Sequence, residues 1–174
     1  GRLLAELDIT PQKPLRRAYE RDPVAIQAWT TQVFPRLRAR AKRVGAEIFF
    51  LDEAGVRSDQ VLGRTWGLRG QTPEVATSGR RQSVSAISAV SARGAFWYEI
   101  YTDRLNAARF TALLHHFLRR RTTRVFLVLD GHPAHTAKAV AQYVQCLKGR
   151  LELHFLPGYA PELNPDEFVW NHLK

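Results

Sequence analysis

The sequence contains one cysteine, no methionine and no long apolar run. The single thiol, Cys146, excludes an internal disulfide framework, and no Cys/His cluster has the spacing of a structural zinc site. No apolar stretch is long enough to cross a bilayer, and no signal-like segment opens the chain. These absences predict a cytoplasmic protein without a membrane partner.

Positive charge, in contrast, is abundant. The 174 residues carry a formal net charge of +10, and 45% of them are hydrophobic, which suits one domain with a single core. Because no basic amphipathic helix of the membrane-binding type is present, nucleic acid is a more suitable polyanionic partner than lipid. A basic surface that binds nothing is the alternative.

Residues 1–45 are expected to form a basic helical region, distinct from residues 46–174. A helix from Pro23 to Arg43 carries a basic cluster at its C-terminal end: Arg36, Arg38, Arg40, Lys42 and Arg43. Its apolar stripe is Val24, Ile26, Trp29, Val33 and Leu37. A second basic cluster is Arg119, Arg120 and Arg121. Both clusters are candidates for contacts with DNA phosphates, although cations that complement a helix dipole or cover a solvated face give the same pattern.

From residue 46 the pattern predicts a mixed α/β domain, in which an antiparallel meander is followed by strand, helix, strand and helix. Asp103 is expected to cap a helix that ends near Arg121. The expected strands cover residues 48–51, 64–67, 83–90, 95–101, 125–129 and 151–156, and the later helices cover residues 134–147 and those from 164 onward. The chain closes inside this last helix, so we expect truncation at the C-terminus.

Two of the apolar strand-like runs end in an aspartate. Asp52 follows residues 48–51, and Asp130 follows residues 126–129. A carboxylate in such a place is costly to desolvate unless a cation or a hydrogen-bond network compensates it, so the pair suggests a shared metal site. Strand alternation sends Glu53 to the face opposite Asp52, where it is interpreted as a surface acid or a salt-bridge partner. For Asp130, the alternative is a cap on the next helix.

A third acid is expected from the segment Asn164-Pro165-Asp166-Glu167. With Asn164 as N-cap, Glu167 could be part of a capping box and Asp166 a helix-dipole acid. Helical spacing places Asp166 closer than Glu167 to the centre of the apolar stripe of this helix. The helix geometry alone therefore leaves the third ligand undecided.

Two histidines follow Asp130 in the segment Asp-Gly-His-Pro-Ala-His. His132 and His135 are possible accessory groups that could hydrogen-bond a ligand or a phosphate. A local hydrogen bond to the backbone is an equal alternative. Neutral imidazole is an unusual ligand for Mg²⁺, which prefers oxygen atoms.

Three segments, DEAGVRSD, LDGHPAH and LPGYAPELNPDEFVW, resemble the DDE endonuclease domain of mariner-like insertion-sequence transposases. The third segment is the most specific of them, and the resemblance covers nearly the whole chain. It implies a ribonuclease H-like fold, and it selects Glu167 over Asp166 as the third member of a catalytic and metal-binding triad with Asp52 and Asp130. Many relatives have asparagine where this chain has Gly131, which is expected to alter a hydrogen bond without removing a ligand.

The resemblance also implies a chemistry and partners. Three carboxylates can hold two Mg²⁺ or Mn²⁺ ions for in-line phosphodiester displacement, by which one site cleaves donor DNA and joins it to a target. The implied partners are the terminal inverted repeats of the element, target DNA and a second copy of the chain, acting at the bacterial nucleoid. Residues 1–45 are then the tail of an N-terminal helix-turn-helix region.

Two other functions compete with an active transposase. One is a catalytically silent DNA-binding remnant of a mobile element, although the intact triad disfavours decay. The other is a different ribonuclease H-like nuclease that cuts branched DNA or RNA hybrids.

Overall fold

The fold was analysed in a computed structural model, which describes residues 2–7, 10, 18–57, 66–67, 69–71, 74 and 83–173. Its α-helices are α1 (Arg2–Glu6), α2 (Pro23–Ala28), α3 (Phe34–Val44), α4 (Ala107–Leu118), α5 (Lys138–Cys146) and α6 (Glu167–Leu173). A π-turn, η1 (Trp29–Val33), joins α2 to α3, and a short 3₁₀ turn, η2 (Pro161–Leu163), precedes α6. The strands are β1 (Ala46–Arg57), β2 (Ser83–Ser91), β3 (Phe96–Tyr101), β4 (Arg124–Leu129) and β5 (Leu151–Phe155).

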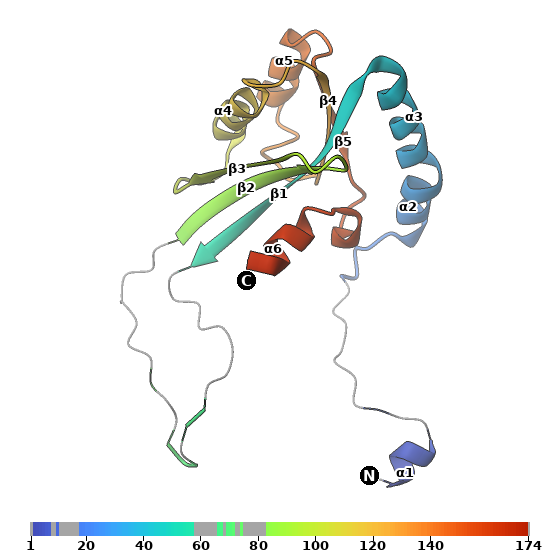
Figure 1. The fold of residues 1–174 in the computed structure, drawn as a ribbon, viewed down its shortest axis with the longest axis vertical. Coiled ribbons are helices and arrows are strands. Elements are labelled where there is room, and N and C mark those ends of the chain that lie inside the picture. Colours follow the sequence, from blue (N-terminus) through green and yellow to red (C-terminus); the bar gives the residue numbers. More distant parts are fainter. Residues whose placement is uncertain are drawn as a thin grey trace.

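The strands form one mixed sheet in the order β3-β2-β1-β4-β5 (Figure 1). β1, β2 and β3 pair antiparallel, whereas β4 pairs parallel with both β1 and β5. This arrangement confirms the mixed α/β order expected from the sequence, because parallel neighbours require a crossover helix between them. Here α4 leads into β4, and α5 connects β4 to β5.

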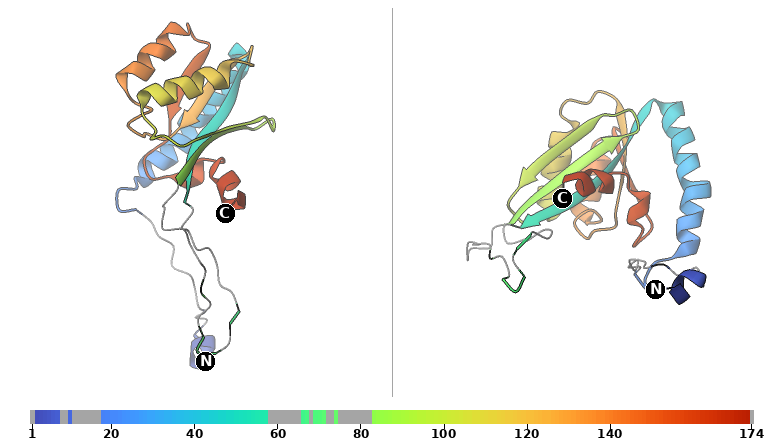
Figure 2. Two further views of the ribbon diagram at one scale, coloured as in Figure 1. Left: turned by 90° about the vertical axis from the view of Figure 1, so that its left-hand side faces the viewer. Right: turned by 60° about the horizontal axis from the view of Figure 1, so that its bottom comes forward.

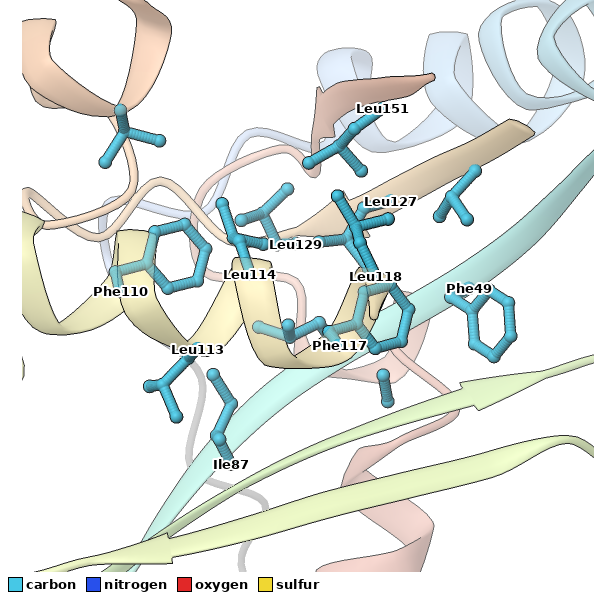
Figure 3. Close-up of a cluster of buried hydrophobic side chains, with 14 of the residues drawn as sticks. Phe49, Ile87, Phe110, Leu113, Leu114, Phe117, Leu118, Leu127, Leu129 and Leu151 are labelled. Atoms are coloured by element: carbon cyan, nitrogen blue, oxygen red, sulfur yellow. The ribbon is translucent and has the colours of Figure 1, made fainter. Parts of the chain in front are cut away.

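Helices cover both faces of the sheet (Figures 1 and 2). On one face, α4 packs its buried side chains against β1 and β4, and Phe117 meets Phe49 edge to face with ring centroids 5.2 Å apart (Figure 3). On the other face, Trp29 and Leu37 from the α2–η1–α3 segment pack on Phe50. Strand alternation explains the division, since successive side chains of β1 point to opposite faces.

The helical region before the sheet agrees with the expectation for residues 23–43, but the expected apolar stripe is only partly correct. Trp29 and Leu37 are buried, whereas Val24 and Val33 are exposed. Val33 belongs to the π-turn, which widens the helix and changes the phase of the side chains around it. Val24 lies in the first turn of α2, where no buried residue is found.

Several expected boundaries differ from the structure, and the last helix begins at Glu167 rather than near residue 164. β1 continues through Asp52 to residue 57, because its antiparallel pairing with β2 extends that far. The helix expected from Asp103 begins only at residue 107 with Asn106 as its cap, and the Asp103 carboxylate instead pairs with Arg109 at 2.6 Å. The helix expected from residue 134 begins at Lys138. The strand expected at 64–67 and the linker-like stretch 7–23 lie largely outside the described residues.

None of the helices in the described parts of the chain combines the length and the apolar composition that a membrane crossing requires.

The packing of α4 on the sheet supplies a test of the fold. Phe117→Ala is expected to lower the free energy of unfolding by about 3–5 kcal/mol, because the fully buried ring leaves a cavity between α4 and β1. Phe168→Ala, at a ring that is 63% exposed on α6, is the matched control and should cost less than about 1 kcal/mol. Urea unfolding measures both. Equal losses for the two variants would contradict the described core.

Candidate active site

Asp52 and Asp130 lie side by side at the centre of the sheet. The parallel pairing of β1 with β4 ends at Phe50 opposite Val128, and each aspartate follows two residues later on its own chain. Neighbouring strands lie about 4.8 Å apart, so the register alone brings the two carboxylates together. The sequence predicted that Asp52 follows the end of a strand. This is wrong for β1, which continues to residue 57, but Asp52 does lie just beyond the end of the pairing between β1 and β4.

Asp52 faces the same side of the sheet as α6. It stands directly opposite Ser88 in the β1–β2 register, and opposite residues of an antiparallel pair share a face. The Ser88 hydroxyl donates a hydrogen bond of 2.8 Å to Asp166, at the start of α6. This contact fixes which face of the sheet the acids occupy.

The segment before α6 is bound to the sheet by side-chain hydrogen bonds. The Asn164 amide Nδ2 donates to the Leu51 carbonyl at 3.0 Å, and the Asp166 backbone N–H donates to Asn164 Oδ1 at 3.2 Å. The Leu51 carbonyl lies just beyond Phe50, where the pairing of β1 with β4 ends. The side chain of Asn164 therefore positions the first turn of α6 against Asp52.

Asp166 and Glu167 have different environments. Asp166 is fully buried, with Oδ2 bonded to Ser88 and Oδ1 without a hydrogen-bond partner among the described residues. Burial raises the pKa of Asp166 to about 6, although the Ser88 hydrogen bond lowers it. Glu167 begins α6 and lines the same hollow as Asp52 and Asp130. Asp166 anchors the helix, whereas the carboxylate of Glu167 is available to a ligand.

The hollow that contains the three acids has a volume of about 390 Å³, and its rim includes His132, Tyr159 and Asn164. No Lys or Arg is found among the described residues that line it. Burial, followed by repulsion from Glu167, raises the pKa of Asp52 to about 7. Three acids around one hollow without a lysine or arginine counter-charge suit Mg²⁺ or Mn²⁺, which prefer oxygen ligands, although the oxygens of these three carboxylates do not all lie within 4.8 Å of one another in the described residues.

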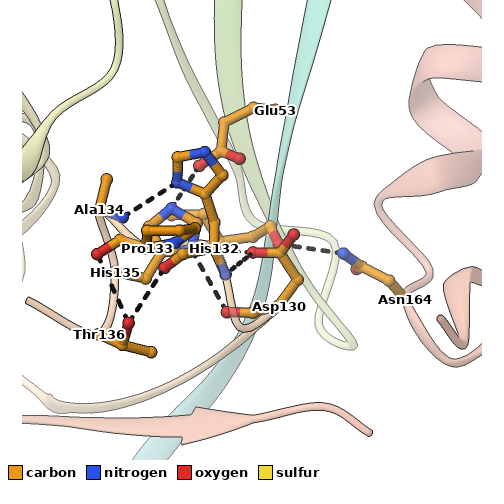
Figure 4. A network of polar contacts seen from close by, with 9 residues as sticks. Glu53, Asp130, His132, Pro133, Ala134, His135, Thr136 and Asn164 are labelled. Carbon is orange, nitrogen blue, oxygen red and sulfur yellow. Dashed lines mark hydrogen bonds and ion pairs between the residues drawn. The ribbon is translucent and has the colours of Figure 1, made fainter. Parts of the chain in front are cut away.

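Asp130 is held in its charged form by its neighbours. Its Oδ1 atom accepts hydrogen bonds from the His132 backbone N–H at 3.1 Å and from His135 Nδ1 at 2.9 Å (Figure 4). The hydrogen bond from His135 is the main reason that the pKa of Asp130 is lowered. A helix cap, the alternative interpretation, is not what the structure shows, because Ala137 is the N-cap of α5.

A second acidic group surrounds His135. Single ligand atoms of Glu53, Asp130 and His135 all lie within 4.8 Å of one another. The Nε2 atom of His135 is 2.6 Å from Glu53 Oε1. Burial lowers the pKa of His135, but hydrogen bonds to Asp130 and Glu53 outweigh it and raise the pKa to about 9. In the absence of a metal ion, a protonated ring between two carboxylates makes this group an ion-paired cluster.

Glu53 is thus a salt-bridge partner, one of the two interpretations taken from the sequence. What the sequence did not reveal is the identity of its partner. Between the two accessory histidines, His132 lies at the exposed rim, with its Nδ1 accepting from the Ala134 N–H at 3.1 Å. His135 is buried beneath the rim and does not line the hollow.

The predicted DNA-contacting residues differ in their availability. Arg36, Arg38, Lys42 and Arg43 are exposed on α3. Arg40 is exposed too, but it pairs with Glu152 at 2.6 Å and lies over the Phe126 ring. Arg38 and Lys42 line another hollow, of about 410 Å³, with Arg93 from the β2–β3 turn. Nothing in the sequence pattern singled out Arg93.

Arg119 and Arg120 are exposed directly after α4 ends and a few residues before β4 begins, whereas Asp130 follows the other end of β4. Arg121 packs its guanidinium over the Phe117 ring, 3.9 Å from the centroid. Burial lowers its pKa accordingly. Arg121 therefore has a packing role, while the phosphate contacts of its two neighbours stay a prediction.

Comparison with known proteins identifies the family and the fold of the chain. The family model for DDE superfamily endonucleases matches residues 47–174, and a winged helix-turn-helix model matches residues 1–33. No curated protein matches the sequence significantly.

Among solved structures, the Mos1 mariner paired-end complex with Mn matches with a TM-score of 0.71 and 20% identity, covering 99% of this chain and 54% of that chain. The Mos1 transposase paired-end complex with left transposon end gives 0.68 and 20%, covering 98% and 54%. The catalytic domain of Mos1 mariner transposase gives 0.60 and 19%, covering 91% and 74%.

The chain belongs to the DDE superfamily endonucleases, whose family model covers most of it. Its sheet flanked by helices has the ribonuclease H-like fold of the mariner transposase catalytic domain. The chain spans about half the length of the first two of these solved relatives.

The raised pKa of Asp52 predicts a stability that depends on pH. Ionisation of Asp52 is disfavoured in the folded state. Asp52 therefore does not destabilise the fold below its usual pKa of 3.8, and the free energy of unfolding falls as the pH rises towards about 7. Asp52→Asn should therefore stabilise the metal-free protein increasingly over this window. Urea unfolding in the presence of a chelator measures the difference.

Asp103→Asn, at an exposed aspartate in the turn before α4, is the matched control and should show no gain that grows with pH. If the curves of Asp52→Asn and the unmodified protein run parallel across the window, the electrostatic description of Asp52 is incorrect.

Proposed function

We propose that this chain is the catalytic domain of a transposase that cleaves DNA and transfers its strand in a divalent-metal-dependent reaction. The observation that carries this proposal is the convergence of Asp52, Asp130 and Glu167 on one hollow, from two adjacent strands and a helix. Membership of the DDE superfamily endonucleases supports it, because that family is defined by endonuclease activity.

Asp52, Asp130 and Glu167 are proposed as the ligands of two Mg²⁺ or Mn²⁺ ions. When bound, such ions activate a water molecule or a 3′-hydroxyl and stabilise the departing oxygen of an in-line displacement. Two features of the chain support this: the β1–β4 register makes residues 52 and 130 neighbours, and the bond from Asn164 to the Leu51 carbonyl attaches the segment before Glu167 to β1. The mariner transposase Mos1 has been solved in paired-end complexes with Mn and with Mg.

The partners are proposed from the relatives and from charge. Mos1 transposase has been solved in paired-end and strand-transfer complexes. We therefore propose that this chain acts as a homodimer on the terminal inverted repeats of its element and on target DNA at the nucleoid. The match of residues 1–33 to a winged helix-turn-helix supports residues 1–45 as the tail of a DNA-binding region that precedes the catalytic domain of residues 46–174.

A nicking assay tests the catalytic assignment. A labelled duplex that bears the terminal repeat is incubated with Mg²⁺ or Mn²⁺ and with the variants Asp52→Ala, Asp130→Ala, Glu167→Ala or Asp166→Ala. Each of the first three should abolish cleavage while DNA binding persists, because removal of a ligand prevents metal binding without changing the basic surface. Asp166→Ala should lower stability but retain metal-dependent cleavage by the folded fraction.

The same assay separates the competing functions. Binding without cleavage in the unmodified protein would identify a silent remnant, and a preference for branched DNA or RNA hybrids would identify another ribonuclease H-like nuclease. Loss of cleavage in Asp166→Ala together with full cleavage in Glu167→Ala would reassign the third ligand to Asp166.

DNA binding by the α3 face has its own test. Neutralising Arg38, Lys42 and Arg93 together should weaken binding to unrelated duplexes equally, and it should lower the salt dependence of binding by about one unit for each lost phosphate contact. Arg121→Gln is the matched control, because its guanidinium is used in packing. It should lower the stability and leave the salt dependence unchanged. If the salt dependence of binding is unaltered in the triple variant, these cations are solvated surface groups that do not contact DNA.

A further inference from the structure

His135 is fixed between two carboxylates that come from different faces of the sheet. Its side chain is 1% exposed, with Nδ1 2.9 Å from Asp130 Oδ1 and Nε2 2.6 Å from Glu53 Oε1. The ring also packs on Phe110, with centroids 4.2 Å apart. Every polar atom of the imidazole is therefore used, and the ring has no freedom to rotate.

These contacts leave Asp130 with one oxygen held and one oxygen available. Oδ1 accepts from both His135 and the His132 backbone, whereas none of the hydrogen bonds described for Asp130 uses Oδ2. The Asp130 side chain is 57% exposed, so little else restrains its terminal torsion, which is intrinsically broad for a carboxylate. The hydrogen bonds to Oδ1 thus decide where Oδ2 points.

Glu53 in turn decides where His135 points. Strand alternation places Glu53 on the α4 face and Asp52 on the α6 face, although the two are neighbours in β1. A single strand therefore contributes Asp52 to the hollow directly and, through Glu53 and His135, also restrains Asp130. The link passes beneath the hollow, since neither Glu53 nor His135 lines it.

We propose that His135, held by Glu53, is a positioning residue that orients Asp130 so that Oδ2 is directed towards the metal ions. This inference rests on the proposed function, in which Asp130 is a metal ligand. His135 does not touch the substrate or the ions, because its side chain is buried and both ring nitrogens are engaged. It acts through a hydrogen bond to a ligand, and such supporting contacts affect metal affinity strongly.

Two amide substitutions separate the contributions of the ring nitrogens. The amide nitrogen of asparagine can take the place of Nδ1 and bond Asp130, but it does not reach Glu53. The longer glutamine places its amide nitrogen near Nε2, where it bonds Glu53 and leaves Asp130 Oδ1 with the His132 backbone N–H as its remaining donor. Affinity for Mn²⁺ is measured by calorimetry, cleavage is followed as a function of Mn²⁺ concentration, and thermal unfolding is recorded for each variant.

His135→Gln is expected to weaken Mn²⁺ binding by about 10–100-fold and to require correspondingly more Mn²⁺ for cleavage. His135→Asn should weaken Mn²⁺ binding clearly less than His135→Gln, since it keeps the bond to Asp130 although it loses the bond to Glu53. His116→Gln is the matched control, because it also removes a histidine paired with a glutamate, Glu99, but on the exposed surface of α4. It should leave Mn²⁺ affinity unchanged.

A purely structural role would lower the unfolding temperature of both His135 variants without separating their Mn²⁺ affinities, and that result would overturn the inference. Unchanged affinity in His135→Gln would overturn it as well. Asp130→Ala distinguishes this failure from failure of the proposed function. If Asp130→Ala abolishes Mn²⁺ binding while the His135 variants retain it, only the positioning role is wrong; if Asp130→Ala binds Mn²⁺ normally, the metal site itself is wrong.

Discussion

The parallel register between β1 and β4 is the constraint on which the candidate site depends. Because Phe50 pairs with Val128, residues 52 and 130 must be neighbours at the point where the two strands separate. The separation matters as much as the pairing, since it leaves the Leu51 carbonyl free to accept from Asn164. One backbone feature therefore places two acids side by side and also supplies the attachment for the helix that carries the third.

The three acids occupy different electrostatic environments, although they share one hollow. A hydrogen bond from His135 lowers the pKa of Asp130, whereas burial and repulsion from Glu167 raise that of Asp52. The metal-free fold thus tolerates the acids by stabilising one charge and protonating another near neutral pH. At the proposed metal site, a divalent cation would remove the reason for protonation, so we expect its binding to release a proton from Asp52.

The sequence was sufficient for features that depend on local patterns. Apolar runs identified β4 and most of β1, alternation separated Asp52 from Glu53, and the family resemblance gave the fold. It was insufficient where a side chain bonds across elements. The partner of Glu53, for example, is a histidine 82 positions away. Hydrophobic periodicity contains no information about such contacts, because they arise only when β1 and β4 pair.

The choice between Asp166 and Glu167 shows the same limit. Helical spacing favoured Asp166 as the inward residue, and it is indeed the more buried of the two. Inward on this helix, however, means towards Ser88 and the sheet rather than towards the hollow. The helix begins at Glu167, and the segment directly before it is attached to β1 by the hydrogen bond from Asn164 to Leu51. The position of the helix relative to the hollow therefore depends on β1. Burial in the core and access to a ligand are therefore separate properties here, and the less buried residue, Glu167, is the one that lines the hollow with the two aspartates.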